Sequence, residues 1–129
     1  MLKFINKAEE DLLGSGLEDS FGLYEVVWYL NRIYQEASIA EKYSLADSLV
    51  KKALVEGHIK LYEESSTRNS SKDYIKELTK NQSLDLIKAP DTWYPVGTNG
   101  CLISYMTTNL GETRYDLLVR ERLKNEKRN

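Results

Sequence analysis

The sequence predicts an α+β fold in which helices pack on a small antiparallel sheet or hairpin. Three observations lead to this prediction. Within residues 20–62, two stretches place apolar residues at helical spacing, and a short segment after them alternates like a strand. A second alternating stretch begins at Cys101. The chain has 129 residues, 41% of them apolar, which suits a single domain spanning residues 1–129.

The first helix is predicted within residues 21–36. At 100° per residue its apolar side chains fall in an arc of roughly 120°, the width of a stripe that faces a core. The arc contains Leu23, Val26, Val27, Leu30, Ile33 and Tyr34. Ser20 is expected to cap this helix, because its hydroxyl can accept from the first free amides. Tyr24 and Trp28 lie outside the arc, where they either cover the N-terminal segment or form an exposed patch.

A second helical pattern follows, and it starts at Ser38. Glu41 lies three residues later, which is the spacing of a capping box, and Gly57 occupies the place of a left-handed C-terminal residue. Residues 39–56 fit either one helix or two short helices joined by a turn, and residues 59–62 alternate as in a strand. The apolar set is Ile39, Tyr43, Leu45, Ala46, Leu49, Val50, Ala53 and Leu54.

The remaining segments are assigned from composition and spacing. Residues 1–13 predict a short helix that ends at the glycines after it, and residues 63–72 contain no apolar side chain and predict a loop. We interpret residues 63–90 as an insertion between two strands. The insertion is expected to carry a helix over residues 71–80 and a further helical turn around residues 84–87.

The C-terminal part predicts a hairpin followed by a tail. Residues 101–107 and 113–119 both alternate, and the turn formers of residues 108–111 separate them. The pair is expected to extend the strand at residues 59–62 into a small sheet. Residues 120–129 carry five cations and two acids, so they form a basic C-terminal tail with a net charge of +3.

Two runs of the sequence resemble parts of one known architecture. IAEKYSLADSLVKKALVEGHIKLYE, residues 39–63, resembles the helix, turn, helix and first wing strand of winged-helix domains. CLISYMTTNLGETRYDLL, residues 101–118, resembles their wing hairpin. The resemblance implies a winged-helix-like arrangement and no particular activity.

The sequence contains little that points to catalysis. His58 is the only histidine, which excludes a His pair for zinc, and its place after a helix C-terminus is a sufficient structural reason for it. Cys101 precedes Leu102 and Ile103 and is interpreted as a core residue. No glycine run is completed into a phosphate-binding loop. We therefore expect no enzyme, no catalytic residue, no metal and no cofactor.

The expected location is cytoplasmic. The N-terminal run MLKFINKAEEDLL reaches acidic residues early and lacks the apolar core of a signal peptide. No window of the sequence has the roughly 18 consecutive apolar residues that a membrane span requires. The single cysteine agrees, because one thiol cannot form an internal disulfide.

Charge is distributed unevenly, and this indicates a partner. Residues 1–25 carry six acids and two lysines, a local net charge of −4, which favours a basic protein partner over a phosphate backbone. The alternative is that these charges only solvate the surface. Tryptophans are the candidate anchors, either in an interface or packed in the fold. The candidate partner-binding residues are Glu9, Glu10, Asp11, Glu18, Asp19, Trp28, Glu63, Glu64 and Trp93.

Two functional hypotheses follow. A small acidic single-domain chain resembles the immunity proteins that neutralise bacterial toxin domains, including those of contact-dependent growth inhibition. That resemblance implies a cognate nuclease whose basic active site is covered by acidic side chains. The second hypothesis is a winged-helix DNA-binding regulator. It would use Ser48, Lys51, Lys52, Arg114 and the basic tail.

Overall fold

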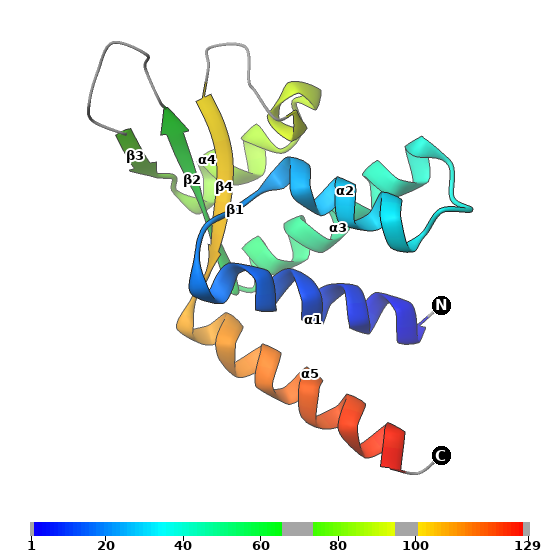
Figure 1. Cartoon of the computed structure of the whole chain (residues 1–129). Helices are drawn as coiled ribbons and strands as arrows, with labels where there is room; N and C mark the ends of the chain where they lie inside the picture. The colour runs from blue at the N-terminus through cyan, green and yellow to red at the C-terminus, as the bar shows by residue number, and fades with distance from the viewer. Residues whose placement is uncertain (1, 66–73, 95–100, 128–129) are drawn as a thin grey trace.

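The computed structural model describes residues 2–65, 74–94 and 101–127 and has the predicted α+β class (Figure 1). Helices pack on a four-stranded sheet whose order is β1-β4-β2-β3, and every neighbouring pair is antiparallel. The elements are α1 (Leu2–Glu18), β1 (Phe21–Gly22), α2 (Leu23–Ile33), α3 (Ile39–Val55), β2 (Ile59–Ser65), β3 (Tyr74–Glu77), α4 (Lys80–Leu86), η1 (Pro90–Trp93), β4 (Cys101–Thr107) and α5 (Asn109–Lys127).

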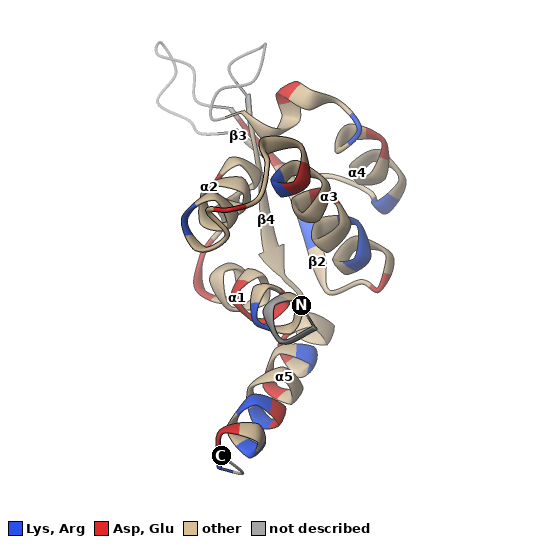
Figure 2. Cartoon of the chain, turned by 90° about the vertical axis from the view of Figure 1, so that its right-hand side faces the viewer, with Lys and Arg blue, Asp and Glu red and all other residues tan. Residues whose placement is uncertain are grey.

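The helices form two groups around the sheet. In Figure 1, α2, α3 and α4 lie on one side of the sheet, while α1 runs below α2 and α3 and packs on β4. The last helix, α5, follows directly from β4, packs on α1 and extends away from the body (Figure 2). The first and last described helices, α1 and α5, therefore pack on each other.

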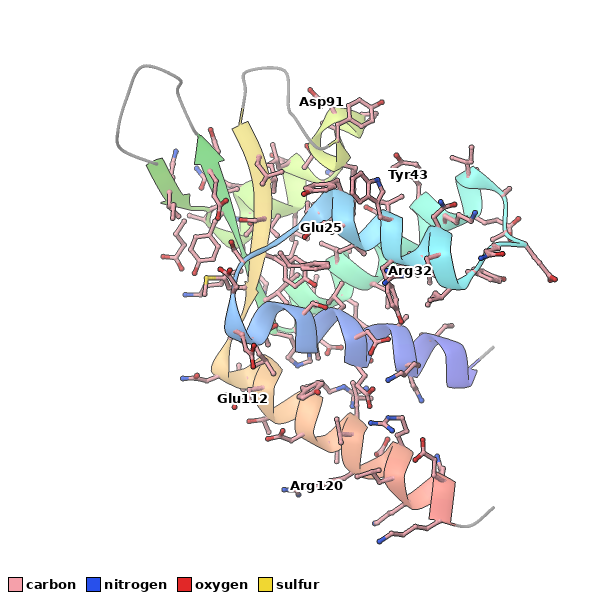
Figure 3. The ribbon with its side chains drawn as sticks, viewed as in Figure 1. Glu25, Arg32, Tyr43, Asp91, Glu112 and Arg120 are labelled. Atoms are coloured by element: carbon pink, nitrogen blue, oxygen red, sulfur yellow. The ribbon has the colours of Figure 1, made fainter. Side chains whose placement is uncertain are left out.

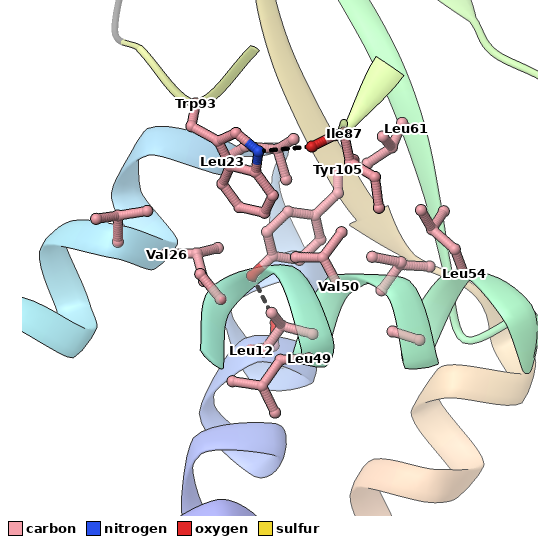
Figure 4. Close-up of a cluster of buried hydrophobic side chains, with 14 of the residues drawn as sticks. Leu12, Leu23, Val26, Leu49, Val50, Leu54, Leu61, Ile87, Trp93 and Tyr105 are labelled. Carbon is pink, nitrogen blue, oxygen red and sulfur yellow. Dashed lines mark hydrogen bonds between the residues drawn. The ribbon is translucent and has the colours of Figure 1, made fainter. Parts of the chain in front are cut away.

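The core lies between the sheet, α2 and α3, with Tyr105 near its centre (Figure 4). Tyr105 is fully buried, and its hydroxyl donates to the Leu12 carbonyl at 2.7 Å. Trp93 covers the opposite end and donates from Nε1 to the Ile87 carbonyl at 3.0 Å. Both polar groups are thus satisfied inside the core, which a buried tyrosine or tryptophan needs.

Much of the segment 20–62 is confirmed. Leu23, Val26, Val27 and Leu30 are buried as the spacing predicted. Ser38 and Glu41 form the predicted capping box, with Glu41 N donating to Ser38 Oγ at 3.1 Å. Gly57 adopts the left-handed conformation, with φ at 75°. Of the two alternatives for residues 39–56, the chain takes the single helix α3. Its buried apolar side chains are Ala46, Leu49, Val50, Ala53 and Leu54.

Three local predictions in this part are wrong. Ile33, expected in the core, is exposed, because α2 ends there and the chain turns away toward α3. Ile39 and Tyr43 are also exposed, since they lie in the first turns of α3. Ser20 does not cap α2; the cap is Gly22, whose amide donates to the Glu25 carboxylate at 3.0 Å.

The first helix is longer than predicted. α1 continues past residue 13 through both glycines to Glu18. β4 stabilises this extension from the side, because the Thr107 hydroxyl donates to the Leu13 carbonyl at 2.6 Å. Gly16 lies against the same strand, where an added Cβ would be 2.6 Å from Thr107 Oγ1. Gly16 therefore permits close packing of helix on strand, and neither glycine ends the helix.

The predicted hairpin over residues 101–119 is wrong in its second half. Residues 101–107 form β4, but residues 113–119 belong to α5. Thr108 starts the helix, since its hydroxyl accepts from the Gly111 amide at 3.1 Å. A Cβ on Gly111 would lie 2.1 Å from the His58 carbonyl oxygen, so this first turn fits only with glycine. The basic tail of residues 120–129 is, as far as residue 127, the end of the same helix.

The chain between β2 and β4 also differs from its prediction. The helix expected over residues 71–80 is wrong, since Tyr74–Glu77 is the edge strand β3, paired with β2. The helical turn expected around residues 84–87 is confirmed as α4, which Thr79 caps by accepting from the Gln82 amide at 3.1 Å. The loop predicted over residues 63–72 is wrong for residues 63–65, which belong to β2, and residues 66–73 lie outside the described part.

Candidate functional site

Glu9 of α1, predicted to contact a partner, is instead a structural residue. Its side chain is buried and accepts two hydrogen bonds from Arg114, from Nε at 3.0 Å and Nη2 at 3.1 Å. Lys52 adds a third contact at 3.3 Å. Burial by itself would raise the pKa of Glu9, but Arg114 and Lys52 outweigh it and lower the pKa below its usual value. Glu9 therefore joins α1 to α3 and α5.

Glu10 has the same role one position later. It is buried and accepts from Lys7 at 2.7 Å and from Arg122 at 2.8 Å. Burial acts to raise its pKa, and the two cations outweigh burial and lower it. A carboxylate held in this way has no free charge to offer a partner, so both Glu9 and Glu10 leave the candidate contact set.

Asp11 is more accessible and lies beside Tyr29 of α2. The Tyr29 hydroxyl donates to the Asp11 carboxylate, and Lys7 Nζ is 3.2 Å from the other carboxylate oxygen. Burial, followed by the hydrogen bond to Asp11, raises the pKa of the Tyr29 phenol. Asp11 and Tyr29 therefore connect α1 to α2 at the surface.

The other predicted acids are spread over two places. Glu18 and Asp19 are exposed at the end of α1. Glu63 and Glu64 are half-buried on β2, and Glu64 accepts from the Ser104 hydroxyl at 3.1 Å. The sequence grouped all of these acids by sign, whereas the structure does not bring them together on one surface.

The two tryptophans differ sharply. Trp93 is 5% exposed. Of the two roles predicted for it, anchoring an interface or packing in the fold, the structure shows packing in the core. Trp28 is 60% exposed on the outer side of α2. Tyr24 contacts it edge-to-face, with ring centroids 4.9 Å apart and an interplanar angle of 81°. Trp28 is therefore the candidate anchor that remains at the surface.

A cleft of about 600 Å³ adjoins Trp28 between α1 and α2. Arg32 contributes to it, with its guanidinium carbon 6.0 Å from the centre of the Tyr29 ring. Glu25 and Arg32 both project from α2, which lies above α1 in the view of Figure 3. The lining consists of aromatic and charged side chains with two small residues: Glu10, Asp11, Gly14, Ser15, Phe21, Glu25, Trp28, Tyr29, Arg32 and Tyr115. We call this the Trp28 cleft.

Sequence reasoning found Trp28, Glu10 and Asp11 but missed most of this cleft. Glu25 and Arg32 were not among the predicted contact residues. Tyr115 was assigned to a strand, whereas it reaches the cleft from α5. Residues 109–127 have no clear apolar stripe, so local spacing does not reveal that a helix brings this ring to the cleft.

The residues proposed for DNA contact are also distributed differently from the prediction. Ser48 and Lys51 are exposed on α3. Lys52 and Arg114, however, both contact Glu9, so one carboxylate offsets part of their positive charge within the fold. A basic surface for phosphates would consist of Lys51 and part of α5.

His58 has a structural position at the end of α3. Its side chain is mostly buried, and Nδ1 lies 3.4 Å from Glu56 Oε2 without a hydrogen bond. The peptide carbonyl of His58 accepts from the Thr108 amide at 2.9 Å, which ties α3 to the start of α5. Among the described residues, no three His, Cys, Asp or Glu side chains are grouped so that they could hold a metal.

Comparison with known proteins adds no relative. No protein-family model, curated protein or solved structure matches this chain. In the described residues, no helix combines the length and the apolar character that a bilayer crossing demands.

Proposed function

We propose that this chain is a non-enzymatic protein-binding domain, an immunity protein that neutralises a toxin domain of nuclease type in the bacterial cytoplasm. It would act by covering the basic active site of that toxin. One observation carries the proposal: Trp28, a large aromatic side chain, is 60% exposed beside a cleft lined with carboxylates. Exposed tryptophans that adjoin a hollow are typical of the few residues that dominate a protein interface.

The acidic residues that remain available to contact a partner lie on α1, on the connection that follows it and at the start of α2. Glu18 and Asp19 end α1, and Glu25 begins α2 on the same connection between the two helices. Asp11 reaches the cleft from α1. Because Glu9 and Glu10 are neutralised within the fold, the proposed contact set is Trp28 with Asp11, Glu18, Asp19 and Glu25. Such a set attracts a basic surface and speeds its association.

The alternative, a winged-helix DNA-binding regulator, has weaker support. Two of its four named contact residues, Lys52 and Arg114, are engaged by Glu9. Lys51 and Ser48 remain exposed on α3. DNA binding is therefore measured separately from binding to a protein partner.

The first test is protection. The proposal predicts that the reading frame next to this one encodes the toxin domain, and that domain is expressed in bacteria with and without this chain while growth is followed. We expect protection by the wild-type chain and its loss with Trp28→Ala, since removing a central interface aromatic costs about 2 kcal/mol or roughly 30-fold in affinity. Ile39→Ala is the matched control, because Ile39 is 74% exposed on α3 and lies outside the Trp28 cleft.

The second test is direct binding. Association of the purified chain with the same domain is measured against salt, and DNA binding is measured by gel shift. Charge reversal of Glu18 and Asp19 should slow association at low salt, whereas Glu9→Gln should leave its rate unchanged. Equal protection by wild type and Trp28→Ala, or a DNA complex that Lys51→Glu abolishes, would refute the proposed function.

A further inference from the structure

The aromatic side chains of the Trp28 cleft are arranged in a way that suits a cation. The guanidinium carbon of Arg32 lies 6.0 Å from the Tyr29 ring centre, which is the geometry of a cation–π contact. Trp28, one turn before Arg32, is contacted edge-to-face by Tyr24 and is 60% exposed. The larger indole is therefore open to the same kind of contact, and tryptophan is the aromatic residue that binds cations best.

Carboxylates lie on both walls of the cleft. Glu25 is fixed by the Gly22 amide at 3.0 Å and by the Tyr24 hydroxyl at 3.3 Å. Asp11, on the α1 wall, is 30% exposed and is fixed by Tyr29 from the opposite wall and by Lys7 of its own helix. A carboxylate has about four acceptor positions, so both retain capacity for a further donor.

The charges that oppose a cation must be counted as well. Arg32 and Lys7 are positive, and Lys7 already contacts both Glu10 and Asp11. Glu10 adds nothing, because Lys7 and Arg122 neutralise it. Arg32 therefore remains as the competitor: it occupies one aromatic face and lies near the carboxylates that an incoming cation would use.

We infer that the Trp28 cleft receives an arginine side chain of the partner, with the guanidinium stacked on Trp28 and hydrogen-bonded to Asp11 and Glu25. The identity of the partner rests on the function proposed above, whereas the chemistry rests on the cleft. Arginine fits better than lysine, because its planar guanidinium stacks on aromatic rings, donates in a fork that matches a carboxylate, and is less strongly hydrated. In this arrangement the aromatic ring stacks on the guanidinium, and the neighbouring carboxylates accept its hydrogen bonds.

The test uses a defined probe in place of the partner. A tetra-arginine peptide, acetylated and amidated, is titrated at low salt into the ¹⁵N-labelled chain, and the indole N–H signal of Trp28 is followed by NMR. The signal is assigned with Trp28→Phe, since the other indole belongs to buried Trp93. The control peptide replaces arginine by citrulline, which keeps the shape and removes the charge. We expect saturable shifts with arginine and none with citrulline.

Variants of the chain test the direction in which each side chain changes peptide binding. Trp28→Ala should weaken peptide binding at least threefold, Trp28→Phe less, and Ile39→Ala not at all. Arg32→Ala should strengthen binding about twofold to fivefold, because it removes the resident cation. If Arg32→Ala instead weakens binding, or citrulline binds as well as arginine, the cleft is not a cation site and the inference is wrong.

The inference and the proposed function can fail separately. If the arginine peptide does not bind, but Trp28→Ala still abolishes protection and capture of the toxin domain, the inference falls and the function stands. If the peptide binds with the expected signs while no protection or capture occurs, the cleft is a guanidinium site and the proposed function falls.

Discussion

The replacement Glu9→Gln tests whether α1 carboxylates hold the fold together or face a partner. Glutamine keeps the size of the side chain and removes its charge, so the double hydrogen bond from Arg114 and the contact with Lys52 lose their electrostatic part. The structure predicts a large loss of stability and no change in association with a partner. If Glu9 were a surface contact, the opposite pattern would be found.

The expected magnitude follows from burial. Breaking a fully buried ion pair costs about 3–5 kcal/mol, and an exposed one about 0–1 kcal/mol. The Glu9 side chain is 7% exposed, but Arg114 is 28% exposed and can recover part of its hydration. We therefore expect a loss of about 2 kcal/mol in the free energy of unfolding, or roughly 6–10 °C in Tm for a domain of this size.

The assay is urea denaturation at pH 7 on four proteins: wild type, Glu9→Gln, Arg114→Met and the double variant. The double-mutant cycle should give a coupling energy of about 1–2 kcal/mol between the two side chains. Glu18→Gln is the matched control, because Glu18 lies on the same helix and is exposed. The reasoning is refuted if Glu9→Gln changes stability by less than about 0.5 kcal/mol, the range of an ordinary surface substitution.

Three further predictions concern other parts of the fold. Glu9 and Glu10 both have pKa values lowered from 4.5. Their contribution to stability is therefore complete above that pH and is lost as the pH falls through their lower folded values. Urea midpoints measured between about pH 7 and pH 3 should drop in the wild type and drop less in the variant in which both residues are replaced by glutamine. Gly111→Ala should cost about 3 kcal/mol by calorimetry, because the new methyl group would meet the His58 carbonyl 2.1 Å away. Trp93→Phe should cost about 2 kcal/mol, since it leaves a backbone carbonyl without its donor and a gap in the core.

Each of these predictions has a control that separates it from a general effect. Trp28→Phe at the surface should stay within about 0.5 kcal/mol of wild type, in contrast to the change at Trp93. Leu110→Ala, next to Gly111 but 65% exposed, should be equally mild. Equal costs for either pair of variants, or identical acid sensitivity with and without the α1 carboxylates, would contradict the packing described above.

Local signals in the sequence were reliable where neighbouring residues satisfy one another. The capping box at Ser38 and Glu41, the left-handed Gly57 and the buried stripe of α2 were all predictable, because each needs only residues within one or two turns. The α+β class followed from the same patterns. The arrangement of the Trp28 cleft was not predictable, since its residues come from three helices and the strand β1.

The hairpin failed because alternation is an ambiguous signal. Residues 113–119 largely alternate apolar and polar side chains, yet they belong to α5, which packs on α1 through Tyr115 and Leu118 together with two ion pairs, Arg114 with Glu9 and Arg122 with Glu10. A helix held by ion pairs has no clear apolar stripe, so helical spacing was hidden. The same contacts removed Glu9 and Glu10 from the predicted interface.

The sequence by itself determined the class of the fold and the residues that cap the two ends of α3. Only the tertiary structure decided which charges are free, because a carboxylate on α1 is neutralised or available according to the cations that α3 and α5 bring to it. It also decided which tryptophan is buried. Burial and pairing depend on segments distant in the chain, and composition and local spacing carry no information about those segments.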